Sequence, residues 1–278
     1  MNARRSSRYP LFVLFAAILL LLSACQPAAL ATSPQPTQPP TQPTAAPVIL
    51  VTQTPAQPSS GAPADITLDY SAVAQNVTVE TVAAQPASAG GPYWEAAPQY
   101  RRLTLQGYPV ANHLLKPQIF IYPAGDLASA NENAGKIAAD LQALLQTQQA
   151  GDHLPFLPQF NASQVMHAQV QYLDFKSGKG VRFLTQFDQA ALPINNYELI
   201  YTFQGLTSDG KYYIAAILPV TNPELPTGSE VSEQQAKALN DFPDYLSRMV
   251  TLLNQQPADS FTPGLNKLDA LIRSIEVK

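Results

Sequence analysis

The chain has very little cysteine and histidine. Cys25 is the only cysteine among 278 residues, so no disulfide can form within the chain. Any folded part must therefore be stabilised by apolar packing and hydrogen bonds. The three histidines, His113, His153 and His167, are far apart in the sequence and share no i, i+4 spacing. The sequence thus predicts neither a metal site nor a cofactor.

Sequence patterns of common catalytic centres are also missing. No Gly-x-Ser-x-Gly motif is present to place a serine nucleophile on a sharp turn between a strand and a helix. Gly178-x-Gly180 is too short for a phosphate-binding loop and lies between two expected strands. We expect Asp174, Glu198 and Asp209 on strand faces and in turns. A pair of carboxylates that hydrolyses glycosidic bonds is an open alternative. The sequence predicts no catalytic residue.

Long apolar runs are scarce, and the one that stands out lies near the start of the chain. Leu11–Leu22 has twelve residues, fewer than the roughly 20 that a membrane-spanning helix needs. Arginines precede it and small residues follow it, which is the layout of a secretory signal peptide. The sequence Leu22-Ser23-Ala24-Cys25 at its end resembles the lipobox of bacterial lipoproteins.

This resemblance implies that the Cys25 sulfur is acylated with diacylglycerol and that the peptide is cut just before Cys25. Two alternatives are an ordinary signal peptide with an incidental cysteine and an uncleaved N-terminal membrane helix. The position of the only cysteine at the cleavage point favours the lipoprotein. We therefore expect a lipid-anchored protein on the extracytoplasmic face of the cell membrane, held by acyl chains at Cys25.

Residues 26–64 contain ten prolines and no charged residue. Too few large apolar side chains are present to offset the entropy of ordering this stretch. Val48–Val51 is its one apolar patch and could add a strand to the folded part. We expect a signal peptide over residues 1–24, a disordered tether rich in Pro, Thr and Gln over 25–64, and one globular domain over 65–278.

The expected mature protein is acidic. Three of the 16 basic residues precede Cys25, which leaves 13 basic and 20 acidic residues and a net charge of −7. A surface with this balance does not attract nucleic acid or anionic lipid. The expected partners are instead the membrane, through the lipid at Cys25, and an envelope protein or glycan.

Alternating apolar residues predict an antiparallel sheet. Short strands are expected near Ile66–Tyr70 and Val77–Glu80, followed by strands at 102–106 and 118–122. Residues 165–187 and 199–220 each read as two alternating runs joined by a turn. The expected fold class is α+β, with two long hairpins and N-terminal strands forming a sheet covered by helices.

The helical spacing of apolar residues predicts the helices that cover the sheet. An apolar stripe over 137–145 indicates a helix that begins near Ser129 or Asn131 and ends before Gly151. A turn is expected at 123–126 and an apolar loop at 154–158, where two prolines exclude a helix interior. Further helices are expected from a capping box at 232–235, after Asp241 and after Thr262-Pro263, with an edge strand near 274–277.

Aromatic side chains are the remaining indication of a binding site. Tyr93 and the only tryptophan, Trp94, follow a loop rich in Pro and Gly, where rigid aromatics with polar tips suit contacts with peptide, sugar or protein. The tyrosines of the second hairpin fit core and sheet-face positions better. We therefore name Tyr93 and Trp94 as candidate binding residues.

The domain resembles uncharacterised envelope lipoproteins of bacteria in three segments, 117–123, 201–213 and 268–275. That family implies no activity. The order of hairpins, helix and closing segment is also similar to the Mog1/PsbP-like fold, which implies an antiparallel sheet between helices and no functional residue.

The resulting functional expectation is a lipid-anchored binding or scaffolding protein of the bacterial cell envelope, without evident catalytic chemistry. The alternatives are an envelope hydrolase acting on sugars or peptides and a ligand-capture lipoprotein serving a transporter.

Overall fold

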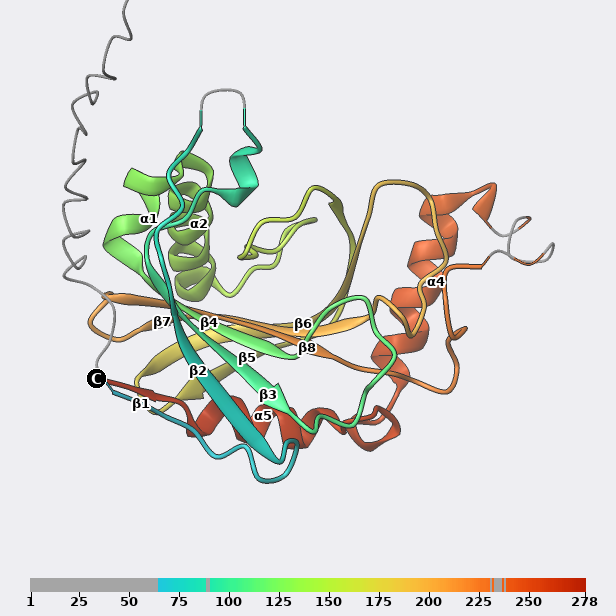
Figure 1. Ribbon diagram of the computed structural model, residues 1–278. Coiled ribbons are helices and arrows are strands. Elements are labelled where there is room, and N and C mark those ends of the chain that lie inside the picture. Colours follow the sequence, from blue (N-terminus) through green and yellow to red (C-terminus); the bar gives the residue numbers. More distant parts are fainter. Residues whose placement is uncertain (1–64, 89–90, 231, 233–236, 238) are drawn as a thin grey trace, which may run out of the picture. The chain divides into compact units, whose positions relative to one another are not determined.

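The computed structural model describes residues 65–278 except 89–90, 231, 233–236 and 238 (Figure 1). The expected signal peptide, the lipidation site Cys25, the tether and most of the capping box at 232–235 lie outside the described residues. Among the described residues, no helix has the length and apolarity to span a bilayer.

Seven antiparallel strands form one sheet in the order β2-β3-β4-β8-β7-β6-β5. They are β2 (Asn76–Val82), β3 (Tyr100–Gln106), β4 (Gln118–Pro123), β5 (Ser163–Phe175), β6 (Gly178–Asp188), β7 (Ile200–Thr207) and β8 (Tyr212–Pro219). The sheet thus joins two meanders, β2-β3-β4 and β5-β6-β7-β8, which meet where β4 pairs with β8.

The expected α+β class and both long hairpins are confirmed, as β5-β6 and β7-β8. The β7-β8 turn contains Gly210, whose φ of 71° favours glycine, after Asp209, whose carboxylate accepts a bond from the Lys211 amide. The strand expected at Ile66 does not join the large sheet. It is the two-residue strand β1 (Ile66–Thr67), which pairs with β9 (Glu276–Val277) at the other end of the domain sequence.

The helices in the described part are α1 (Ala124–Ala130), α2 (Glu132–Thr147), α4 (Phe242–Gln255) and α5 (Leu265–Ser274), with 3-10 turns η1 (Tyr93–Glu95) and η2 (Ala258–Ser260). Asn131 caps α2 as expected, since its side chain accepts bonds from the Asn133 and Ala134 amides. One expectation was wrong, because the turn expected at 123–126 is the start of α1. As expected, α2 ends before Gly151, at Thr147, with a left-handed Gln148 as its C-cap.

The sheet is covered on both faces, so its strands alternate between two apolar cores. Val181 and Phe183 on β6 belong to the core under α1, α2 and the 154–157 loop. Leu184, the residue after Phe183, belongs to the core under α4 and α5. Figure 1 shows α1 and α2 on one side of the sheet and α5 on the other. We call these the α2 face and the α5 face.

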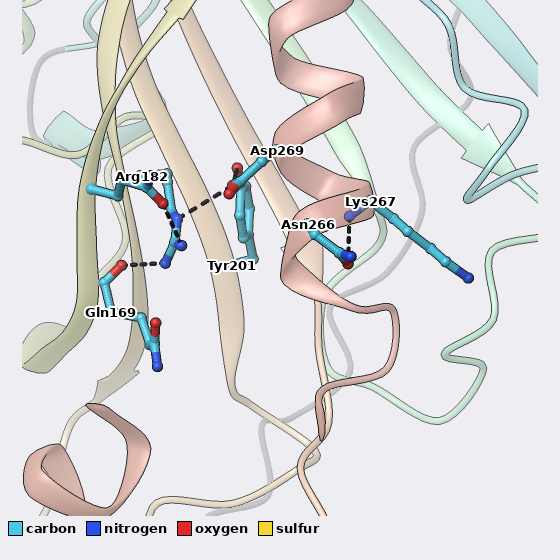
Figure 2. A network of polar contacts seen from close by, with 7 residues as sticks. Gln169, Arg182, Tyr201, Asn266, Lys267 and Asp269 are labelled. Carbon is cyan, nitrogen blue, oxygen red and sulfur yellow. Dashed lines mark hydrogen bonds and ion pairs between the residues drawn. The ribbon is translucent and has the colours of Figure 1, made fainter. Parts of the chain in front are cut away.

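The α5 face contains a buried ion pair, shown in Figure 2. Arg182 Nε of β6 lies 3.3 Å from Asp269 Oδ1 of α5, and the two side chains are 6% and 10% exposed. The Tyr201 hydroxyl donates to the same oxygen at 2.9 Å, and Arg182 also donates to the Gln169 carbonyl and the Gln171 side chain. The pKa of Tyr201 is raised well above its usual value, first because the ring is buried and then because Asp269 is close. This network joins β5, β6 and β7 to α5.

Candidate functional site

Two adjacent hollows lie beside each other, the first on the α2 face and the second at the sheet edge formed by β5, next to the start of α4. The first has a volume of about 650 Å³ and lies between α2, the 151–164 segment and Phe187. The second has a volume of about 690 Å³ and lies between residues 160–165, the end of β6 and Phe242 at the start of α4. Both are lined by Tyr93, Phe160 and residues 162–163, so they are neighbours along one surface. We call the two together the aromatic groove.

Packed aromatic rings form the first hollow. The Phe156 ring centroid lies 4.4 Å from that of Phe187 and 5.2 Å from that of Phe160, and Phe160 meets Phe187 edge to face at 5.1 Å. Tyr93 stands at the rim, 54% exposed, with its ring edge-on to Trp94 at a centroid distance of 5.1 Å. Separations of this size are typical of favourable aromatic pairs.

The sequence-predicted binding residues therefore have different positions. Tyr93 lines both hollows, whereas Trp94 lines neither of them and contacts the groove through the Tyr93 ring. Both belong to the short 3-10 turn η1. The structure thus joins Tyr93 to phenylalanines from the 151–162 segment and β6 that the sequence did not single out.

Two buried glutamines hold the floor of the groove. Gln204 of β7 accepts a bond from the Leu157 amide at 3.0 Å and donates to the Leu157 carbonyl at 3.2 Å. Gln164 of β5 does the same for Leu154, at 2.9 and 3.3 Å. Each side-chain amide thus makes the two backbone hydrogen bonds that a neighbouring strand would otherwise make to the 154–157 loop. The expected apolar loop at 154–158 is confirmed, since Leu154, Phe156 and Leu157 are buried.

Asn131 fixes the rim in a similar way. While its Oδ1 caps α2, its Nδ2 donates to the carbonyls of Tyr93 and Ala96, at 2.6 and 3.2 Å, and to Gln159 Oε1 at 3.0 Å. One buried amide therefore connects α2, the turn that presents Tyr93 and the 151–162 segment. The groove is held by hydrogen bonds before any ligand arrives.

A buried carboxylate lines the second hollow. Asp188 is 6% exposed, and its Oδ2 accepts a bond from Gln186 Nε2 at 2.8 Å. The same nitrogen donates to Glu198 Oε2 at 3.3 Å, and Asn195 Nδ2 donates to that oxygen at 2.6 Å. Burial raises the pKa of Asp188 to about 6, with a further contribution from the Glu198 charge and an opposing one from the Gln186 bond. Glu198, expected at a strand face or turn, is thus linked to Asp188 by the shared Gln186 amide.

The described lining of the groove contains acidic side chains but no lysine or arginine. The described residues that line the two hollows include Asp140 and Asp188 but no lysine or arginine, and His153 is their one histidine. A site with this lining attracts a neutral or cationic ligand and repels an anionic one.

His153 and His167 lie close enough to affect each other electrostatically, whereas His113 has other partners. The pKa of His167 is lowered first by burial and then by the charge of nearby His153. His113 accepts a bond from the Leu115 amide through Nδ1 and lies 3.0 Å from the Leu199 carbonyl through Nε2, which is a structural arrangement. Within the described part of the chain, no group of three or more His, Cys, Asp or Glu side chains could hold a metal ion.

A further hollow of about 630 Å³ lies between α2 and the turns of the two hairpins. Small residues such as Gly125, Ala138 and Gly178 form much of its lining, and no aromatic ring contributes to it. Aromatic rings supply most of the contact energy in binding sites. The aromatic groove is therefore the stronger candidate.

No family model, curated protein or solved structure matches the chain. The resemblances to the lipobox, to envelope lipoproteins and to the Mog1/PsbP-like fold stay predictions from the sequence.

Proposed function

We propose that this protein is a lipid-anchored binding protein of the bacterial cell envelope and that the aromatic groove is its binding surface. The acylated Cys25 would hold it at the membrane, and residues 26–64 would separate the domain from the lipid. The observation that carries the proposal is the groove itself, where exposed Tyr93 adjoins a preformed aromatic hollow. Groups of rigid aromatic side chains in a concave, preorganised surface are typical of binding sites.

Membrane attachment is tested by Cys25→Ser. We expect this variant to lose the acyl chains and to leave the membrane fraction, because a thioether cannot form on serine. Cell fractionation with metabolic labelling by a fatty acid measures both effects. A variant that stays in the membrane fraction like the wild type would show that Cys25 is not the anchor.

The binding surface is tested by Tyr93→Ala against Leu114→Ala. Both side chains are 54% exposed, but Leu114 lies outside the two hollows. We expect Tyr93→Ala to reduce capture of an envelope component at least tenfold and Leu114→Ala to reduce it less than twofold. Equal losses, or none, would argue against the groove.

An envelope hydrolase is the second candidate, because Asp188 and Glu198 bond to one nitrogen at 2.8 and 3.3 Å. Their oxygens are separated by no more than the sum of these distances, which includes the roughly 5–5.5 Å spacing of a retaining glycosidase pair. Glu198, however, does not line either hollow. Hydrolysis of envelope glycan that Asp188→Asn abolishes would favour this candidate over a binding protein.

A further inference from the structure

We infer that the second hollow binds the ammonium group of a lysine side chain in an extended peptide segment, with Asp188 as its counter-ion and Tyr93, Phe160 and Phe242 as its aromatic wall. This inference rests on the proposed function of the groove and gives its ligand a chemical class.

The charge and the aromatic rings of the second hollow suit an ammonium group. Its described lining has one carboxylate, Asp188, three aromatic rings and no basic side chain. An ammonium group gains from both a carboxylate and the faces of aromatic rings when it leaves water. A carboxylate offers about four acceptor positions, so Asp188 keeps capacity beyond its bond from Gln186.

The hydrogen-bond partners of the polar residues favour a peptide over a glycan. Gln164 is occupied at both ends by the Leu154 backbone, Gln159 accepts from Asn131, and Gln189 Nε2 donates to the Asn161 carbonyl. These amides hold the walls together, so much of their bonding capacity is unavailable to the many hydroxyls of a sugar. The aromatic rings of the groove and the carboxylates of Asp140 and Asp188 remain for a ligand.

The two hollows together fit a chain with two different side chains. The first hollow presents Leu144, Phe156 and Phe187 to an apolar group, and the second presents Asp188 to a cation. They share Tyr93 and Phe160, so their occupants lie next to each other. Residues i and i+2 of an extended chain point to the same side about 7 Å apart. An aromatic or aliphatic residue followed two positions later by lysine satisfies this arrangement.

The test uses three peptides that differ at one position: acetyl-Phe-Gly-Lys-amide and its norleucine and glutamate counterparts. Titration of the full-length protein in detergent is followed by the fluorescence of Trp94, the only tryptophan, which contacts Tyr93. We expect the lysine peptide to bind at least tenfold more tightly than the other two. Equal affinities, or binding of chitotriose but not of the lysine peptide, would overturn the inference.

Two matched variants locate the effect. Asp188→Asn should remove the preference for lysine over norleucine, whereas Asp140→Asn, the same change in the first hollow, should leave it within twofold. Because Asp188 is buried, folding of its variant is checked by near-UV circular dichroism. Tyr93→Leu, at an exposed position, provides a second variant and should reduce the preference several-fold by removing a ring face. A preference that survives in both Asp188→Asn and Tyr93→Leu would refute the assignment.

This test separates two kinds of failure. If Tyr93→Ala abolishes capture of an envelope component but the lysine peptide shows no preference, the groove is the binding surface and its assignment to lysine is wrong. If Tyr93→Ala changes neither capture nor peptide binding, the proposed function and the inference both fail.

Discussion

The two faces of the sheet are built from the same strands but are closed in different ways. On the α5 face, an ion pair between Arg182 and Asp269 lies beneath a helix, and both charged side chains are nearly inaccessible. On the α2 face, neutral amides from Gln164 and Gln204 hold a loop that has no strand partner, and two hollows open beside it. A helix completes its own backbone hydrogen bonds and can cover its face fully, whereas a loop needs side chains to do so. We therefore propose that the α5 face provides structural rigidity and that the aromatic groove provides ligand access.

The largest expected effect is on the α5 face. Arg182→Ala should lower the free energy of unfolding by about 3–5 kcal/mol, because it leaves Asp269 buried without its counter-ion. Denaturation by urea measures this loss. The double variant Arg182→Met with Asp269→Leu is the control, since it removes both charges and should recover most of the stability. A single variant as stable as the wild type would mean that the ion pair does not hold α5.

The clamps of the α2 face should have the next largest effect. Gln204→Ala leaves both the amide and the carbonyl of Leu157 without their partner, which should cost about 2–4 kcal/mol. It should also speed hydrogen exchange at the Leu157 amide and weaken capture by the groove. Arg182→Ala should leave capture by the surviving folded protein unchanged. If Gln204→Ala alters stability but not capture, the preformed floor is not needed for binding.

A smaller effect concerns pH and Asp188. Since burial raises the pKa of Asp188 in the folded protein to about 6, above its usual 3.8, folding takes up a proton between these values. The contribution of Asp188 to stability is therefore greatest at low pH and is lost as the pH rises through about 6. The charge that acts with it is that of Glu198, which also raises the pKa of Asp188.

Asp188→Asn removes this proton uptake. Compared with the wild type, the variant should gain on the order of 1–2 kcal/mol in relative stability between pH 4 and pH 7. Urea denaturation at both pH values measures the difference, and Asp140→Asn is the control. Parallel pH profiles for wild type and Asp188→Asn would contradict the burial of a charged carboxylate beside the groove.

Periodicity was sufficient to predict most of the fold from the sequence. The alternation in 165–187 and 199–220 gave both hairpins, because each strand contributes to two cores and the turns between them are short. The same signals could not show that β4 pairs with β8, since this contact joins segments about a hundred residues apart. Nor could they show that Ile66 leaves the large sheet to pair with Val277.

The candidate site was only partly predictable. Tyr93 could be named because an aromatic residue beside a Pro- and Gly-rich loop is unusual enough to notice. Gln204 and Asn131 could not be named as site residues from the sequence. A polar residue in a strand is expected to be exposed, and one at a helix start is expected to be a cap. Their bonds to Leu157 and Tyr93 depend on segments that meet only in the folded chain. A glutamine inside an otherwise apolar strand is the signal that could have indicated the clamp.

The central claim is that binding belongs to the aromatic groove and structural support to the α5 face. Its most direct test places a photo-crosslinking amino acid at Tyr93, at Leu114 and at Lys267, which is exposed on α5. After irradiation of intact cells, adducts are compared between the three positions by mass spectrometry. We predict a specific adduct from Tyr93 and none from Leu114 or Lys267. Adducts of equal yield from all three positions, or an adduct from Lys267 alone, would contradict the account.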